Sequence, residues 1–362
     1  MTVRQHRRLA DGRDLFYYDL GPGADRSAPD TRELPETATS SQIRWDPLFS
    51  EWTVIAGHRQ SRTYKPPVSL CPLCPSRDGK ATEIPGCDYD VAVFENRFPS
   101  LATTAIEAAD VFGVVEDFPF RSGPGTGRCE VVCFTSDHNT SFAQLSQRHA
   151  RTVIDALADR TAELSRLPEV EYVFCFENRG EEIGVTLSHP HGQIYGYPFV
   201  PPRMLQAAQT AADYQDEHGQ CLRCELLRRE VAAAERVISR TEHWTALVPF
   251  AARWPYEARL IANRHVASLP ELTEDERDDL ARCHLDLLQR FDRLFDTPTP
   301  YIAGWHQAPV RRFADSWHLG TEVFTVRRAP GKLKYLAGSE SGAAVWINDI
   351  TPESAAARLR GD

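Results

Sequence analysis

The 362-residue sequence lacks any apolar run long enough to span a bilayer. Its N-terminus, MTVRQHRRLADGRDL, is basic but lacks the apolar core of a signal peptide. Positive charge is also scarce, because 51 acidic side chains outnumber 41 basic ones and leave a net charge of −10. These absences argue against a membrane protein and against a nonspecific nucleic-acid binder, and they predict a cytoplasmic location.

The nine cysteines are an odd number, and four of them form two C-x-x-C pairs, CPLC at 71–74 and CLRC at 221–224. In a reducing compartment this pattern favours metal binding over disulfides. The composition is otherwise ordinary for a globular protein, with 42% hydrophobic and 25% charged residues.

Short runs of β-branched and aromatic residues that end at turn residues predict strands within 44–56, 89–99, 129–135 and 171–180. Apolar residues at helical spacing predict long helices over 141–167 and 271–295, the second with a capping box in TEDE. Residues 21–42 are rich in Gly, Pro, Ser and Asp, which predicts a mobile or extended segment. These patterns together predict an α+β fold.

Three landmarks recur in the same order and predict a duplicated unit. Each half has a C-x-x-C pair, then a lone histidine before the long helix (His138, His265), then a histidine in SHPHGQ or WHLGTE (His189, His318). The second and third landmarks are 51 residues apart in one half and 53 in the other. We therefore expect an N-terminal segment over 1–42, partly extended or mobile, followed by two halves over 43–205 and 206–362.

Each half offers two thiolates and two imidazoles, which are typical ligands of tetrahedral zinc. The two sets are Cys71, Cys74, His138 and His189, and Cys221, Cys224, His265 and His318. Four protein ligands close the coordination sphere, so the first zinc should be structural. A redox pair is the other interpretation of C-x-x-C, but SLCPLCPSRDG reads as a Pro-rich turn rather than the start of a thioredoxin-like helix. The second set should also bind zinc, unless that repeat has lost its metal.

The stretch TLSHPHGQIYGYP places His189 and His191 two residues apart, on the same face of an extended strand. If His189 binds a metal, His191 stays free for chemistry, and its counterpart in the second half is Gly320. Gln193 lies on the same face, where its amide can donate to an oxygen beside His191. A neutral imidazole with a neutral donor suits attack on phosphorus, whereas the plainer alternative is a buried core histidine.

The motifs CPLC, DHNTSF, FENRG, SHPHGQ, GWHQAP and YLAGSE…IND resemble the galactose-1-phosphate uridylyltransferase family of the histidine-triad superfamily, from about Arg44 to Arg360. The resemblance implies a duplicated histidine-triad-like unit, mainly an antiparallel sheet with long helices packed on it. It also implies ping-pong exchange of UMP between UDP-glucose and galactose 1-phosphate through a uridylylated His191. Triad hydrolases carry a third histidine where this chain has Gln193, which favours transfer over hydrolysis.

The resemblance also assigns substrate-binding roles by motif, and it implies a homodimer in which one subunit completes the sugar site of the other. The assigned residues are Arg59 and Arg62 for phosphates, Phe94 and Asn96 for uracil and ribose, Asn178 and Thr186 for phosphates, and Lys334 and Glu340 for the hexose phosphate. Without the resemblance, the stretch with Arg59 and Arg62 would be interpreted as a solvated basic turn, and the stretch with Phe94 and Asn96 as an ordinary strand end. The stretch with Lys334 and Glu340 would be interpreted as a charged loop.

The chain departs from the family pattern in three ways, one of which is the N-terminal segment that the motifs do not explain. Some members bind iron through an H-x-H, another histidine and a glutamate, but here the H-x-H positions are Gly320 and Glu322. Only His306 of that set remains, so the resemblance does not carry iron over to this chain. Trp346 stands where some members have a glutamine that touches the sugar phosphate, which leaves the sugar open.

Two alternatives remain at this stage. One is a related sugar-nucleotide transferase or phosphorylase that uses another base or sugar. The other is a noncatalytic zinc-stabilised binding module, which would make His191 dispensable and would gather basic residues on one face. The acidic net charge and the asymmetry between His191 and Gly320 argue against the binding module.

Overall fold

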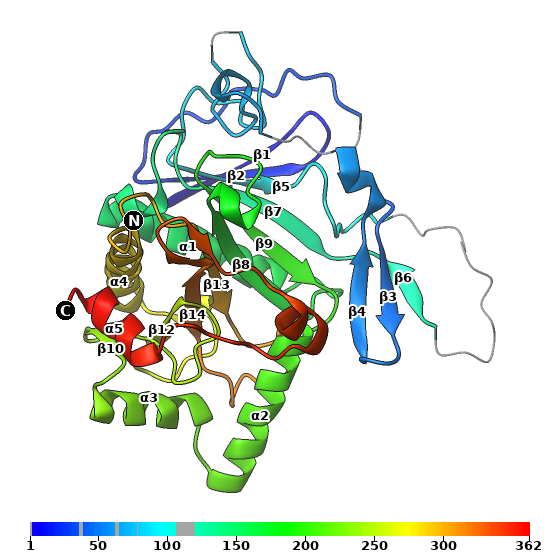
Figure 1. Cartoon of the computed structure of the whole chain (residues 1–362). Helices are drawn as coiled ribbons and strands as arrows, with labels where there is room; N and C mark the ends of the chain where they lie inside the picture. Colours follow the sequence, from blue (N-terminus) through cyan, green and yellow to red (C-terminus); the bar gives the residue numbers. More distant parts are fainter. Residues whose placement is uncertain (1, 36–38, 62–64, 78, 106–119) are drawn as a thin grey trace.

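The computed structural model describes residues 2–35, 39–61, 65–77, 79–105 and 120–362. Its centre is an 11-stranded sheet in which every neighbouring pair is antiparallel (Figure 1). In spatial order the strands are β1 (Val3–Arg8), β2 (Asp14–Asp19), β5 (Val91–Glu95), β7 (Arg128–Cys133), β9 (His191–Tyr197), β8 (Tyr172–Arg179), β13 (Tyr301–His306), β14 (Gly320–Thr325), β12 (Tyr256–Ala262), β11 (Trp244–Leu247) and β10 (Val237–Arg240).

The strand order is symmetric about the pair β8 and β13. Outward from this pair run β9, β7 and β5 on one side, and β14, β12 and β11 on the other. The long helix also has the same place along the chain in each half: one lies between β7 and β8, and the other between β12 and β13. The prediction of a duplicated α+β unit is therefore confirmed, and the hydrogen bonds between β8 and β13 join the two halves into one continuous sheet.

Two long helices, α1 (Gln147–Leu164) and α4 (Glu274–Asp292), pack against each other and against the sheet. In α4, Thr273 and Glu276 form the predicted capping box. The helix predicted over 141–167 begins later than expected, because Phe142–Gln144 forms a separate 3-10 turn and the Ser146 side chain caps α1 by accepting from His149 N–H. Both helices bury aliphatic side chains such as Ile154 and Leu288 in the main core.

Three further helices complete the C-terminal half: α2 (Pro202–His218), α3 (Leu222–Ala233) and α5 (Pro352–Arg360). Two small sheets lie apart from the main one. The first, β4 (Glu51–Ile55), β3 (Gln42–Asp46) and β6 (Ser122–Pro124), projects from the side of the molecule (Figure 1), and the second pairs β15 (Arg327–Ala329) with β16 (Lys332–Leu333).

The face of the sheet that carries Phe94 and Val131 is covered by a loop instead of a helix. Leu73 and Ile84 of this loop are buried with Leu15 in a second apolar cluster. Because directly opposed residues of neighbouring strands share a face, Leu15, Phe94, Val131 and Gln193 lie in one row across the sheet. The loop that brings in the first cysteine pair is thus fixed on the same face as Gln193.

The N-terminal segment contains two strands, β1 and β2, that the sequence patterns did not indicate. Residues 20–35, which follow them, have no helix or strand, yet Arg26 within them is only 5% exposed. The division into halves at 205/206 stays a prediction. No helix in the described part of the chain combines the length and the apolar character that a membrane crossing requires.

Candidate active site and metal centres

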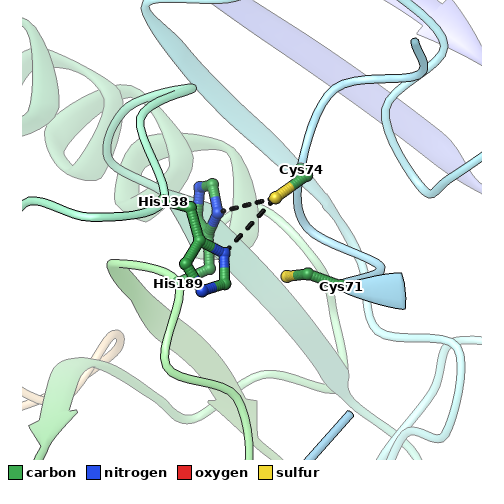
Figure 2. A group of neighbouring side chains, drawn as sticks. All are labelled: Cys71, Cys74, His138 and His189. Carbon is green, nitrogen blue, oxygen red and sulfur yellow. Dashed lines mark hydrogen bonds between the residues drawn. The ribbon is translucent and has the colours of Figure 1, made fainter. Parts of the chain in front are cut away.

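The first predicted metal set comes together at one edge of the N-terminal half (Figure 2). Cys71 and Cys74 lie in the loop after a short 3-10 turn, His138 follows β7, and His189 directly precedes Pro190 and β9. The Cys74 Sγ atom lies 3.3 Å from His138 Nδ1 and 3.6 Å from His189 Nδ1. One ligand atom from each of the four residues lies within 4.8 Å of the others.

This geometry fits a tetrahedral ion. Zinc–sulfur bonds of about 2.3 Å and zinc–nitrogen bonds of about 2.0 Å separate neighbouring ligand atoms by roughly 3.3–3.8 Å. The His189 Nε2–H donates to the Thr135 carbonyl at 2.8 Å, which leaves the Nδ1 lone pair directed at the cysteines. Burial lowers the pKa of His189 to about 4, so the ring is neutral, as a metal ligand must be.

The second predicted set also comes together. The His318 Nδ1 atom lies 3.2 Å from Cys224 Sγ and 3.9 Å from Cys221 Sγ, and the His265 Nδ1 atom lies 3.7 Å from Cys224 Sγ. His318 Nε2 donates to the Ala262 carbonyl at 2.8 Å, just as His189 donates to Thr135. The local structure differs, because Cys221 caps the start of α3 and Cys224 lies in its first turn. Both sets therefore offer a donor geometry that is compatible with zinc.

His191 is the first residue of β9, and its ring is oriented by the backbone. Its Nδ1–H donates to the His189 carbonyl at 2.7 Å, which leaves the Nε2 lone pair available. Burial lowers the pKa of His191, so the ring is neutral. Gly192 is required beside it, because a Cβ there would lie 2.9 Å from Phe134 Cζ and 2.9 Å from the Phe176 carbonyl oxygen.

Gln193 follows on the same face of β9 as His191. The Tyr195 hydroxyl donates to Gln193 Oε1 at 3.2 Å, so the amide NH₂ remains available as a donor. The two predicted catalytic residues thus share a strand face, as their spacing predicts.

A cavity of about 630 Å³ opens beside His191 at the edge of the sheet. Asn178 and Thr186, both predicted to face phosphates, line this cavity together with Lys65 and Ser188. The Thr186 carbonyl accepts from Lys65 N–H at 2.9 Å. The structure thus brings these two predicted residues to His191.

The other predicted binding residues of the N-terminal half do not line this cavity in the described part of the chain. Phe94 is only 2% exposed and packs in the second apolar cluster. Asn96 accepts from Phe98 N–H at 2.9 Å, and Arg59 donates to the Ser100 hydroxyl. Arg62 lies outside the described residues. Their substrate-binding roles stay predictions.

Lys334 and Glu340 form a buried ion pair of 2.7 Å in the C-terminal loop, with side chains 7% and 5% exposed. They are not among the described residues that line the cavity with His191. The ring of Trp346 in the same loop packs at a tilt of 59° against Trp254, with the ring centroids 4.9 Å apart. This loop exposes several apolar side chains, among them Tyr335 at 77% and Ile347 at 56%.

The residues at the family's iron position do not fit a metal. The Glu322 carboxylate accepts from Arg203 at 2.8 and 2.9 Å and from Arg259 at 3.3 Å. Gly320 leaves room for another guanidinium, because a Cβ there would lie 3.1 Å from Arg223 Nη1. Guanidinium groups have no lone pair to give a metal, so His306 is surrounded by ion pairs instead of ligands.

One acidic residue of this cavity was missed by the sequence interpretation. Glu177 lies within FENRG, beside Asn178, and lines the cavity. Burial raises its pKa to about 8, although the Tyr301 hydroxyl donates to it at 3.0 Å. A carboxyl inside a predicted buried strand is the signal that could have identified it.

Comparison with known proteins accounts for nearly all of the chain. Residues 31–201 match the model of the galactose-1-phosphate uridyl transferase N-terminal domain, and residues 207–361 match that of the C-terminal domain. The chain belongs to this family. It is therefore an enzyme of the galactose-1-phosphate uridylyltransferase family, and the resemblance inferred from its motifs is confirmed.

Individual relatives of the family agree. The galactose-1-phosphate uridylyltransferase of Streptomyces lividans is 46% identical over 98% of this chain and 96% of its own length. That of Thermotoga maritima is 37% identical over 88% of this chain and 98% of its own length. A solved uridylyltransferase structure superimposes with a TM-score of 0.77 at 32% identity, covering 88% of this chain and 97% of its own.

A more distant structure shares the fold alone. An ADP-glucose phosphorylase from Arabidopsis thaliana with bound ADP-glucose has a TM-score of 0.66 at 22% identity, covering 89% of this chain and 99% of its own.

Proposed function

We propose that this chain exchanges UMP between UDP-glucose and galactose 1-phosphate by a ping-pong mechanism with His191 as the nucleophile. The observation that carries the proposal is the hydrogen bond from His191 Nδ1–H to the His189 carbonyl. It supports the tautomer in which Nε2 has the lone pair, and His191 is among the residues that line the cavity.

In the first half-reaction, His191 Nε2 attacks the α-phosphorus of UDP-glucose. An N–P bond forms, the bond from the α-phosphorus to the bridging oxygen breaks, and glucose 1-phosphate leaves with the bonding electron pair. The ring then carries a positive charge, which the His189 carbonyl stabilises through the Nδ1–H bond. The Gln193 amide donates to a phosphate oxygen as charge develops.

In the second half-reaction, a phosphate oxygen of galactose 1-phosphate attacks the same phosphorus. The N–P bond breaks, UDP-galactose forms, and His191 regains its lone pair. Asn178 and Thr186 line the cavity that receives both substrates, and they hold the phosphates. Because Gln193 cannot accept a proton from water, hydrolysis of the intermediate is disfavoured.

The covalent intermediate is the direct test of this mechanism. Protein incubated with uridine-labelled UDP-glucose, without galactose 1-phosphate, should retain label, and mass analysis should find one added UMP on the peptide that contains His191. Addition of galactose 1-phosphate should discharge the label as UDP-galactose. Label on another peptide, or discharge only by a different sugar phosphate or by free phosphate, would contradict the assignment of the nucleophile or of the acceptor.

We also propose that both Cys₂His₂ sets bind zinc, which supplies a structural cross-link between each cysteine pair and the strands that carry the histidines. Metal analysis of protein purified without added zinc should find about two ions per chain. Cys221→Ser should lower this content to about one, because a thiolate is lost from the second set only. A content near one in the unmodified chain, unchanged by Cys221→Ser, would contradict the second site.

A homodimer is the proposed assembly, in the cytoplasm, where the thiols stay reduced for metal binding. The exposed apolar side chains of the C-terminal loop, among them Tyr335 and Ile347, support a partner surface there. Sedimentation at micromolar concentration should give a mass of about twice 40.8 kDa. A species at the monomer mass alone would contradict the dimer.

A further inference from the structure

Residues 1–30 precede the part of the chain that matches the family's N-terminal domain, which begins at residue 31. Within this N-terminal extension, β2 pairs with β5, so that Leu15 opposes Phe94 and Tyr17 opposes Ala92. The extension therefore lengthens the main sheet by two strands on the side of the first metal set (Figure 1).

Apolar side chains of the extension pack directly against the cysteine loop. Leu15 and Tyr17 are each 1% exposed, and they belong to the same buried cluster as Cys71 and Leu73. The Tyr17 hydroxyl also accepts from Gly86 N–H at 3.4 Å. Loss of this packing would expose the inner side of the loop to water.

A buried polar chain leads from the extension to the C-x-x-C turn. The Arg13 side chain is 1% exposed and donates to Asp11 at 2.8 Å and to Glu83 at 2.5 Å. Arg32 bonds the other oxygen of Glu83 at 2.9 Å. The backbone N–H of Glu83 in turn donates at 3.0 Å to the carbonyl of Pro72, which lies between the two cysteines.

A second contact fixes the far end of the same loop. Arg26 bridges Asp19 of β2, at 2.6 Å, to Asp88, at 2.8 Å. The next residue, Tyr89, donates from its hydroxyl to the Leu73 carbonyl at 2.8 Å and lies 2.8 Å from His189 Nε2. The extension thus contacts the loop at Glu83, which bonds Pro72, and at Asp88, which is next to Tyr89.

We propose that the N-terminal extension is a positioning element that holds the Cys71–Cys74 turn closed on the first Cys₂His₂ set and slows release of its metal. This inference rests on the proposal that this set binds zinc. The second set is built differently, since its cysteines lie on α3, which packs through Leu227 on Leu247 and Ile261. The two sets therefore allow an internal comparison.

The experiment compares full-length chains that all carry Cys221→Ser, so that the first set is the intact one. Arg13→Met removes one of the guanidinium groups that bind the Glu83 carboxylate, while Arg32 stays on the other oxygen. Zinc release to an excess of chelator should speed up by roughly tenfold or more, because a buried ion pair is broken. Arg13→Lys keeps the positive charge but loses the forked arrangement of donors that a guanidinium has. It should give a smaller increase in the rate of zinc release.

The matched control is Arg236→Met, which also removes a largely buried cation between two carboxylates, Glu230 and Glu353, in the C-terminal half. It should leave zinc release unchanged. Hydrogen exchange gives a readout that does not depend on metal. Amides of residues 71–77 and 79–89 should exchange faster in Arg13→Met, while those of α3 should not change.

The outcomes separate the two proposals. A parent chain that holds no zinc would overturn the zinc site and the retention role together. A normal zinc content with an unchanged release rate in Arg13→Met would overturn the retention role alone. Equal acceleration in Arg236→Met would also overturn it, since the effect would then be general destabilisation.

Discussion

His191→Gly should lower turnover by on the order of 10³-fold or more, because attack on a phosphodiester is slow without a covalent nucleophile. Bound zinc and the unfolding temperature should stay close to those of the unmodified chain, since His189, and not His191, belongs to the metal set. Steady-state assays of UDP-galactose formation, with metal analysis and thermal unfolding of the same sample, measure both effects.

The space vacated in this variant should admit free imidazole. Imidazole would then attack UDP-glucose in place of the missing ring and form uridine 5′-phosphoimidazolide, which chromatography detects. A variant that keeps more than about a tenth of the original activity would contradict the role of His191 as nucleophile. A variant that loses zinc would contradict the assignment of His189 to the metal and of His191 to nucleophilic attack.

His189→Ala should have a different effect, because it removes a proposed zinc ligand that is 1% exposed and that donates to the Thr135 carbonyl. Zinc content should fall by about one ion per chain, and the free energy of unfolding should fall by roughly 2 kcal/mol or more, since metal binding contributes to folding. Activity should fall with them, because loss of the metal should loosen the segment at residue 189, whose backbone carbonyl orients the His191 ring.

Imidazole should not restore activity to His189→Ala, since a free ring cannot replace the link between the metal set and β9. Metal analysis and thermal unfolding, run beside the His191→Gly variant, check this result. If His189→Ala kept both its zinc and its stability while losing activity, the roles assigned to the two histidines would have to be exchanged.

The identity of the acceptor sugar is tested by substrate assays. Trp346 of the C-terminal loop packs on Trp254, and it is not among the described residues that line the cavity beside His191. A panel of nucleotide sugars, assayed with and without galactose 1-phosphate, distinguishes the proposed reaction from a related transferase or phosphorylase. Family membership makes the chain an enzyme, so the alternative of a noncatalytic binding module is set aside.

Much of this protein was predictable from local sequence patterns. The capping box at Thr273 and Glu276, and the helical spacing that follows, depend on residues that are close together in the sequence and need no tertiary contact. The same holds for the two-residue spacing of His191 and Gln193 on one face of β9, whereas His189 lies just before this strand. The repeated order of cysteine and histidine landmarks was enough to predict both metal sets.

Tertiary structure decided the features that depend on distant residues. The pairing of β8 with β13 joins the halves through backbone hydrogen bonds, which no side-chain pattern encodes. β1 was missed because VRQHRR is basic and polar, has no apolar alternation and is stabilised by pairing at the sheet edge. β2 is DLFYYD, and its run of apolar and aromatic residues is the signal that could have predicted it.

The sequence by itself was enough to predict the candidate metal ligands and catalytic residues, because ligand type, spacing on a strand and motif order are local properties. Only the tertiary structure decided what surrounds them: the guanidinium groups around Glu322 in place of iron ligands, and the contact between Arg13 and Glu83, 70 residues apart. Such charges meet only after the chain has folded, since burial selects the partners that leave no charge unpaired.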